Sequence, residues 1–400
     1  MRYTSFTRAQ GSKGHTLWRI LLPRLLGLCV ALCGMMLIAP RTPTALADGG
    51  APNLAYVAGS AQGLSVVDIG QQKVTQNIAL GGDPAMIYLT LDGRYIYVAQ
   101  PGLNKVTLLA ALTGATVCSV TVPGQPSLLA FDAGINTLYV AGNGASGITA
   151  LNGNSCTFQK TIATSSPVYG MGTAEVGSGT NGGTGNQLWF TTTSALNVYQ
   201  GGKIQSIAIA GGPQYITIPA GATVYVTTHQ GTVVAVNLQT LKATAPLLTG
   251  GDFGPMDFDA FTNEVYVPDK KHNQLAVLTP LTYGSDTVPP EPNHVIPLGV
   301  APQSVAITSD GNLGFVALAG GNVAMLDIPG KTLISTIAVG GNPRFIITGL
   351  YPPTTPDKQQ TTTANGTPIP TTLLYSMAVI ALLLLLVIAF LLLLARRRRT

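Results

Sequence analysis

The sequence has few of the residues that most often carry chemistry. Charged residues make up only 9% of the 400 positions, and the chain has four cysteines and four histidines. It contains no C-x-x-C-H sequence for attaching a c-type haem and no paired cysteines in a zinc-binding pattern. It also lacks a G-x-S-x-G nucleophile elbow and a phosphate-cradling glycine loop. The sequence therefore identifies no catalytic centre, and we expect a protein that is not an enzyme.

A basic surface for nucleic acid is also missing. The whole chain carries a net charge of +5, but six of its basic residues precede Ala47 and four lie at 396–399. Between residues 48 and 372 there are eleven Lys and Arg against sixteen Asp and Glu, a net charge of −5. Binding of nucleic acid is disfavoured, because this part has no basic face to neutralise phosphates.

The sequence does contain a repeat of about forty residues that occurs about seven times. Residues 81–122 are one copy of it. Each copy reads as four short strands with period-two alternation between turn residues. The copies align on an aromatic residue followed by an apolar one: Tyr56-Val57, Tyr97-Val98, Tyr139-Val140, Trp189-Phe190, Tyr225-Val226, Tyr266-Val267 and Phe315-Val316. Such repeats bury their apolar faces only by stacking, so the pattern predicts an all-β, seven-bladed β-propeller of four-stranded blades over 48–350.

The two ends of the repeat region predict how the ring closes. The chain enters the repeats on the aromatic strand at 54–59 and leaves on a proline-led strand at 342–350. We therefore expect one blade to be built from N- and C-terminal strands, which removes the open sheet edges.

Five segments carry a resemblance to a known family. They are LDGRYIYVAQ (91–100), AGINTLYVAG (133–142), ATVYVTT (222–228), FTNEVYVPD (261–269) and SDGNLGFVAL (309–318). With these segments the chain resembles the YVTN family of seven-bladed β-propellers. That resemblance implies an exported or surface protein but no single chemistry, because similar propellers include lactonases, lyases and redox-enzyme modules.

Both ends of the chain predict membrane targeting. Residues 1–47 read as a signal peptide: a basic leader, an apolar run at 25–39 of roughly 22 Å as a helix, and an A-x-A site at Ala45-Leu46-Ala47. We expect cleavage after Ala47, with a retained anchor as the alternative. Near the other end, the apolar stretch Leu373–Ala395 is long enough to span a bilayer as a helix.

The tail fixes the expected topology. Residues 396–400 are four arginines and a threonine, and such a basic cluster stays on the cytoplasmic side. Residues 351–372 are rich in Pro and Thr and read as a stalk. We therefore expect a single-pass cell-membrane protein with an extracytoplasmic propeller and a cytoplasmic C-terminus.

Only two cysteines, Cys118 and Cys156, lie in the predicted mature domain. We place them in or just before the outermost strands of neighbouring blades. A disulfide is chemically accessible in an exported compartment, but outer strands diverge and their Cα atoms easily exceed the ~7 Å limit for bridging. The sequence favours two free thiols and leaves the disulfide open.

Two groups of polar residues are candidate sites. Asp257 and Asp259 lie two apart on one strand, but Asp259 aligns with Asp132 at a strand end, so we interpret the pair as turn carboxylates that bond local backbone. The second group, on the same rim of blades five and six, comprises His229, Asp252, Asp269, Lys270 and His272. These residues are a speculative ligand-binding site, with His229 and His272 as weak candidates for metal ligands.

Two function classes are distinguished, and a purely structural role in the cell envelope is not separated from the first of them by sequence. The first is a binding or scaffold module that recognises an extracytoplasmic protein, peptide or glycan. The alternative is an extracytoplasmic, metal-dependent lactonase- or lyase-like enzyme that uses the channel mouth. The scarcity of titratable residues in the strands favours the first, because acid–base chemistry needs positioned groups of suitable pKa. No cofactor is predicted, with a divalent metal left open.

Overall fold

The computed structural model describes residues 53–176, 185–219, 223–238, 240–281 and 292–352. Blade 1 comprises β28 (Phe345–Gly349), β1 (Leu54–Ser60), β2 (Gly63–Asp68) and β3 (Lys73–Ala79); blade 2 comprises β4 (Met86–Leu89), β5 (Tyr95–Gln100), β6 (Lys105–Ala110) and β7 (Thr116–Thr121). Blade 3 comprises β8 (Pro126–Asp132), β9 (Thr137–Gly142), β10 (Ser146–Asn152) and β11 (Phe158–Pro167); blade 4 comprises β12 (Gly170–Val176), β13 (Gly185–Thr191), β14 (Ala195–Gln200) and β15 (Lys203–Ala208). Blade 5 comprises β16 (Pro213–Thr217), β17 (Thr223–Thr228), β18 (Thr232–Asn237) and β19 (Leu248–Thr249). Blade 6 comprises β20 (Asp257–Phe258), β21 (Val265–Asp269), β22 (Gln274–Leu278) and β23 (His294–Pro297); blade 7 comprises β24 (Pro302–Ile307), β25 (Leu313–Leu318), β26 (Asn322–Asp327) and β27 (Thr332–Ala338).

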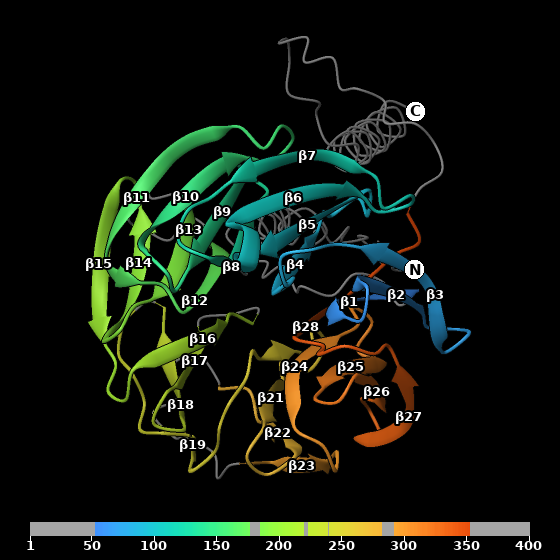
Figure 1. The fold of residues 1–400 in the computed structure, drawn as a ribbon. Coiled ribbons are helices and arrows are strands. Elements are labelled where there is room, and N and C mark those ends of the chain that lie inside the picture. The colour runs from blue at the N-terminus through green and yellow to red at the C-terminus, as the bar shows by residue number, and fades with distance from the viewer. Residues whose placement is uncertain (1–52, 177–184, 220–222, 239, 282–291, 353–400) are drawn as a thin grey trace, which may run out of the picture. The chain divides into compact units, whose positions relative to one another are not determined.

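These seven four-stranded antiparallel sheets form a β-propeller, as the repeat predicts (Figure 1). Within each blade the strands run in order from the first, at the central channel, to the fourth, at the rim. One short 3-10 helix, η1 (Pro101–Leu103), follows β5. The all-β, seven-bladed prediction is confirmed.

The ring closes where the sequence predicts. In blade 1, β28 pairs antiparallel with β1, in a register that runs from Leu54 opposite Gly349 to Ala58 opposite Phe345. The Arg344 amide extends this ladder by donating to the Ala58 carbonyl oxygen at 2.9 Å. The first and last strands of the domain thus pair with each other, and β28 serves as the first strand of blade 1.

The repeated aromatic residues form the packing between blades. All seven lie on second strands and are buried: Tyr56, Tyr97, Tyr139, Trp189, Tyr225, Tyr266 and Phe315. Because side chains alternate along a strand, Tyr266 of β21 packs in the cluster shared with blade 7, while its neighbours Val265 and Val267 pack with blade 5. Each second strand therefore contributes to two interfaces, which explains why stacking is required for stability.

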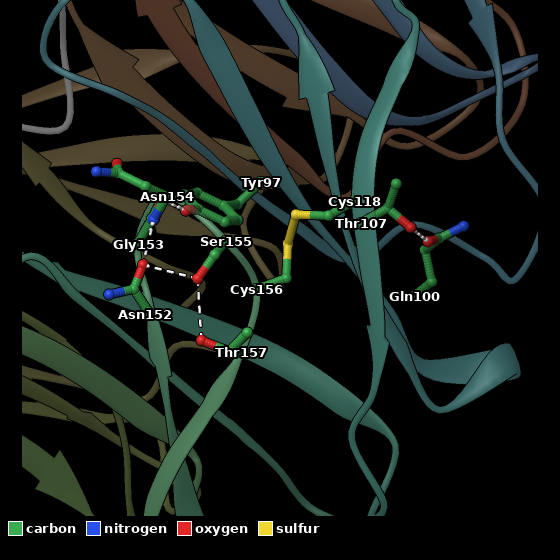
Figure 2. Close-up of a disulfide and its surroundings, with 10 residues drawn as sticks. All are labelled: Tyr97, Gln100, Thr107, Cys118, Asn152, Gly153, Asn154, Ser155, Cys156 and Thr157. Atoms are coloured by element: carbon green, nitrogen blue, oxygen red, sulfur yellow. Dashed lines mark hydrogen bonds between the residues drawn. A yellow bond between two sulfur atoms is a disulfide. The ribbon is translucent and has the colours of Figure 1, made fainter. Parts of the chain in front are cut away.

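A disulfide joins blades 2 and 3 (Figure 2). Cys118 lies on β7, but Cys156 lies in the turn between β10 and β11, with φ +53°, and not in an outer strand. This turn brings the two Cα atoms to 6.2 Å, within bridging distance. The placement in or just before the outermost strands holds, because Cys156 lies two residues before β11. The expectation of two free thiols was wrong, because the two Cα atoms are not separated beyond bridging distance at this point.

The propeller is complete within the described residues. Every strand of the described ranges lies between Leu54 and Gly349 and is paired in one of the seven sheets. The described strands therefore form a closed ring with its own core, and we expect the segment 48–372, which contains all of them, to fold on its own.

The predicted signal peptide, stalk, membrane span and tail lie outside the described residues. Within the described ranges, no helix has the length and apolar character needed to cross a bilayer.

Candidate functional site

The propeller has two faces, which we name by their loops. The mouth face carries the loops that follow each second strand and those that lead into each first strand. The exit face is the opposite one, where the chain enters at Leu54 and leaves after Gly349. All five predicted ligand-binding residues, His229, Asp252, Asp269, Lys270 and His272, lie on loops or strand ends of the mouth face.

Four of these residues meet at blade 6. His272 Nδ1 donates to Asp269 Oδ2 at 2.5 Å, and the Asp252 amide donates to Asp269 Oδ1 at 3.3 Å. Lys270 donates its amide to the Asp252 carbonyl oxygen at 2.8 Å, and its Nζ lies 3.9 Å from Asp252 Oδ1. The Asp269 side chain is only 5% exposed, so its carboxylate chiefly joins the two loops of the blade.

His229 belongs to a different group. The Gln214 side-chain amide nitrogen lies 2.8 Å from His229 Nδ1 and donates to it, and the Tyr169 ring meets the imidazole edge-on at 5.6 Å. His229 is thus held by blades 4 and 5. In the ranges that the structure describes, no group of three or more His, Cys, Asp or Glu is arranged to hold a metal ion. The use of His229 and His272 as metal ligands stays a prediction.

The acidic pair divides into two roles. Asp259 accepts hydrogen bonds from the Phe261 amide at 2.9 Å and the Thr262 hydroxyl at 2.6 Å, which confirms the interpretation as a turn carboxylate. For Asp257 that interpretation was wrong. Its buried carboxylate accepts the Ile307 amide of blade 7 at 2.7 Å. No spacing in the sequence indicates a contact between residues so far apart.

A cavity of about 400 Å³ lies in the mouth of the central channel. All seven blades contribute to it, chiefly through the beginnings of their first strands. Blades 4 and 5 place Tyr169, Gln214 and Tyr215 on its wall, whereas blades 6, 7 and 1 place Lys270, Gln303 and Arg344 there. Its size is that of pockets that hold small organic molecules.

The channel narrows towards the exit face. There the space falls to about 60 Å³ and is lined by aromatic rings of three first strands: Tyr88, Phe131 and Phe258. Phe131 packs against Tyr88 with ring centroids 5.4 Å apart. The large cavity is therefore approached from the mouth face.

Tyr215, on the wall of the mouth cavity, has a protonated phenol. Burial, and to a lesser degree the nearby carboxylate of Asp252, raises the pKa of the Tyr215 hydroxyl above its usual range. The hydroxyl keeps its proton at neutral pH and remains able to donate a hydrogen bond.

Sequence reasoning identified only part of the lining of this cavity. Of the predicted residues, Lys270 lines the cavity, while Tyr169, Tyr215 and Arg344 were not singled out. A signal for all three is present, because each lies one or two residues after a proline of the repeat: Tyr169 after Pro167, Tyr215 after Pro213 and Arg344 after Pro343. Because first strands line a propeller channel, the residues just after these prolines are the ones to examine.

Solved structures resemble this chain in fold. No protein-family model and no curated protein matches it. A functionally unknown protein from Desulfotomaculum acetoxidans matches with a TM-score of 0.60 at 13% identity, over 74% of this chain and 99% of that one. Apo AztD from Citrobacter koseri matches with 0.54 at 11%, over 74% and 97%. Dihydro-heme d1 dehydrogenase NirN, in complex with DHE, matches with 0.53 at 16%, over 77% of each chain.

The likeness is one of fold. At 11–16% identity these structures support the propeller architecture and carry no activity over to this chain.

Proposed function

We propose that this chain is a binding module: an extracytoplasmic β-propeller, of the kind found in the YVTN family, that takes a ligand in the mouth of its channel. The observation that carries the proposal is the cavity of about 400 Å³, lined by side chains from all seven blades. A concave site with an apolar floor and a few converging polar groups is the usual form of a small-molecule site.

The proposed location is the outer surface of the cell membrane. The basic run at 396–399 and the apolar stretch Leu373–Ala395 support a single membrane span with a cytoplasmic tail. The Cys118–Cys156 disulfide supports an extracytoplasmic propeller, because such bridges persist in oxidising compartments. Proteins, peptides or glycans that present a small group to the mouth are the partners this arrangement suits.

Thermal unfolding of the segment 48–372 with a panel of small polar and aromatic compounds tests the proposal. A ligand at a hundred times its dissociation constant stabilises a fold by about 2.7 kcal/mol, a shift of about 4 °C for a domain of this size. We expect at least one compound to give this shift, and Tyr215→Ala to abolish it.

Tyr199→Ala is the matched control. Tyr199 lies on β14, the third strand of blade 4, where its ring contacts Lys160 away from the channel. The control should retain the ligand-induced shift. A ligand whose shift survives Tyr215→Ala, or disappears in Tyr199→Ala alone, would place binding elsewhere.

A further inference from the structure

The mouth cavity has two chemically different walls. Blades 6, 7 and 1 supply Lys270, Gln303 and Arg344, two of which are permanent hydrogen-bond donors with a positive charge. Blades 4 and 5 supply Tyr169 and Tyr215. The rest of the lining is largely apolar and includes Met86, Leu128, Val168 and Met171. A ligand that fits both walls carries an anionic group on one side and a flat apolar body on the other.

Each of the two cations lies near an acid that is more exposed than itself, and each has further donors for the cavity. Arg344 Nη2 lies 2.7 Å from Asp83 Oδ2, while Lys270 Nζ is 3.9 Å from Asp252 Oδ1, too far for a hydrogen bond. Asp83 and Asp252 are 56% and 64% exposed, against 41% for Arg344 and 24% for Lys270. In each pair the acid is therefore the more solvated partner. Exposed ion pairs are weak, so a bound anion can compete with these acids for the two cations.

One carboxylate also lines the cavity. Asp257 is buried and already accepts the Ile307 amide through Oδ2. The charged residues of the described lining are thus two cations, Lys270 and Arg344, and one carboxylate that already accepts a hydrogen bond. His229 stands behind Tyr169, and Asp269 is held by His272. The charge balance of the lining itself favours an anion.

We propose that the mouth cavity binds a small organic anion with a flat, apolar or aromatic body. Its carboxylate or sulfonate lies between Lys270 and Arg344, and its body lies against Tyr169 and Tyr215. Hydrogen bonds to charged donors are the strong ones, and flat bodies gain further from contact with aromatic faces. This inference rests on the proposed function and specifies the ligand class of the same site.

The test compares two probes of nearly the same shape, the anionic 2-naphthoate and the neutral 2-naphthamide, by titration calorimetry on the segment 48–372. We expect naphthoate to bind at least about tenfold more tightly, the effect of one charge-assisted hydrogen bond. The double variant Lys270→Met, Arg344→Met should lose this preference and keep its affinity for naphthamide. The single variant Lys270→Met should lose part of it.

Lys271→Met is the matched control. This neighbouring lysine is exposed and donates from Nζ to the Gly250 carbonyl oxygen at 2.7 Å, outside the cavity lining. It should bind both probes as the parent does. An unchanged melting temperature confirms that each variant is folded.

The outcomes separate the two proposals. Equal affinity for the two probes, blocked by Tyr215→Ala, would overturn the anion preference and leave the binding module standing. A preference for naphthoate that survives the double variant would place the anion elsewhere and overturn the inference. Failure of both probes to bind would overturn the proposed ligand class, while the compound panel still tests the binding function.

Discussion

The carboxylate of Asp257 accepts a hydrogen bond of 2.7 Å from the amide of Ile307, across the boundary between blades 6 and 7. Asp257 belongs to β20, which has only two residues and so offers few ladder bonds of its own. The Asp257 side chain therefore supplies a hydrogen bond at a position where longer first strands are held by main-chain pairing.

We expect Asp257→Ala to lower the free energy of unfolding by about 1–3 kcal/mol, because it removes the acceptor of a buried amide. Asp257→Asn keeps a carbonyl oxygen at this position and should cost less. Urea unfolding of the segment 48–372 measures both. Equal stability of the alanine variant and the parent would show that the bond contributes nothing.

Closure of the ring predicts that the last strand stabilises the whole domain. Deletion of 342–350 removes β28 and opens blade 1, so the truncated segment should melt far below the parent or fail to fold. Ile347→Ala gives a graded version: its side chain is 2% exposed, and its truncation should cost about 2–5 kcal/mol. An unchanged melting temperature after the deletion would rule out closure by β28.

The disulfide predicts a redox-dependent stability. Cys118 and Cys156 are 38 residues apart, and a loop of that length constrains the unfolded chain by about 4 kcal/mol in the chain-entropy model. The variant Cys118→Ser, Cys156→Ser should be about 2–4 kcal/mol less stable than the oxidised parent in urea. Dithiothreitol should destabilise the parent and leave the variant unchanged. A parent insensitive to reductant would argue against the bridge.

The contact between Tyr351 and Asp68, at the end of the propeller, predicts that stability depends on pH. Tyr351 Oη donates to Asp68 Oδ2 at 2.5 Å, and chiefly through this bond the pKa of Asp68 lies below its usual value of 3.8. A folded pKa below the unfolded one adds stability above pH 3.8, and this stability is lost as the pH falls through the folded value.

Tyr351→Phe should therefore lower the melting temperature at pH 6 and lessen its fall as the pH drops from 4 to 2. Melting curves across that range give the comparison. Identical pH profiles for Tyr351→Phe and the parent would show that the hydroxyl does not hold the carboxylate.

The repeat pattern was sufficient to predict the architecture. Pairs such as Tyr97-Val98 recur at a regular spacing because each blade needs the same second strand to pack against two neighbours. The closing pair, β28 with β1, followed from the strand type at each end of the repeats. Both features are encoded locally or by period, so the sequence alone carries them.

The site was less predictable because it depends on contacts between blades. Cys156 lies in a turn of blade 3 and Cys118 on a strand of blade 2, so their bridge forms only when these blades are packed together. Asp257 likewise meets Ile307 only after blades 6 and 7 dock. His229 was expected beside blade 6 but packs with Tyr169 of blade 4. A loop side chain has several possible neighbours in space, and the repeat pattern does not specify which of them it contacts.

Hydrogen exchange of the segment 48–372, with and without a ligand from the panel, tests the central claim most directly. Binding in the mouth cavity predicts slower exchange at the lining residues 168–171, 214–216, 303, 305 and 306, and no change in the exit-face turns at 132–136 and 259–263. Protection confined to the exit face or to the outer strands would contradict the assignment of the channel mouth as the binding site.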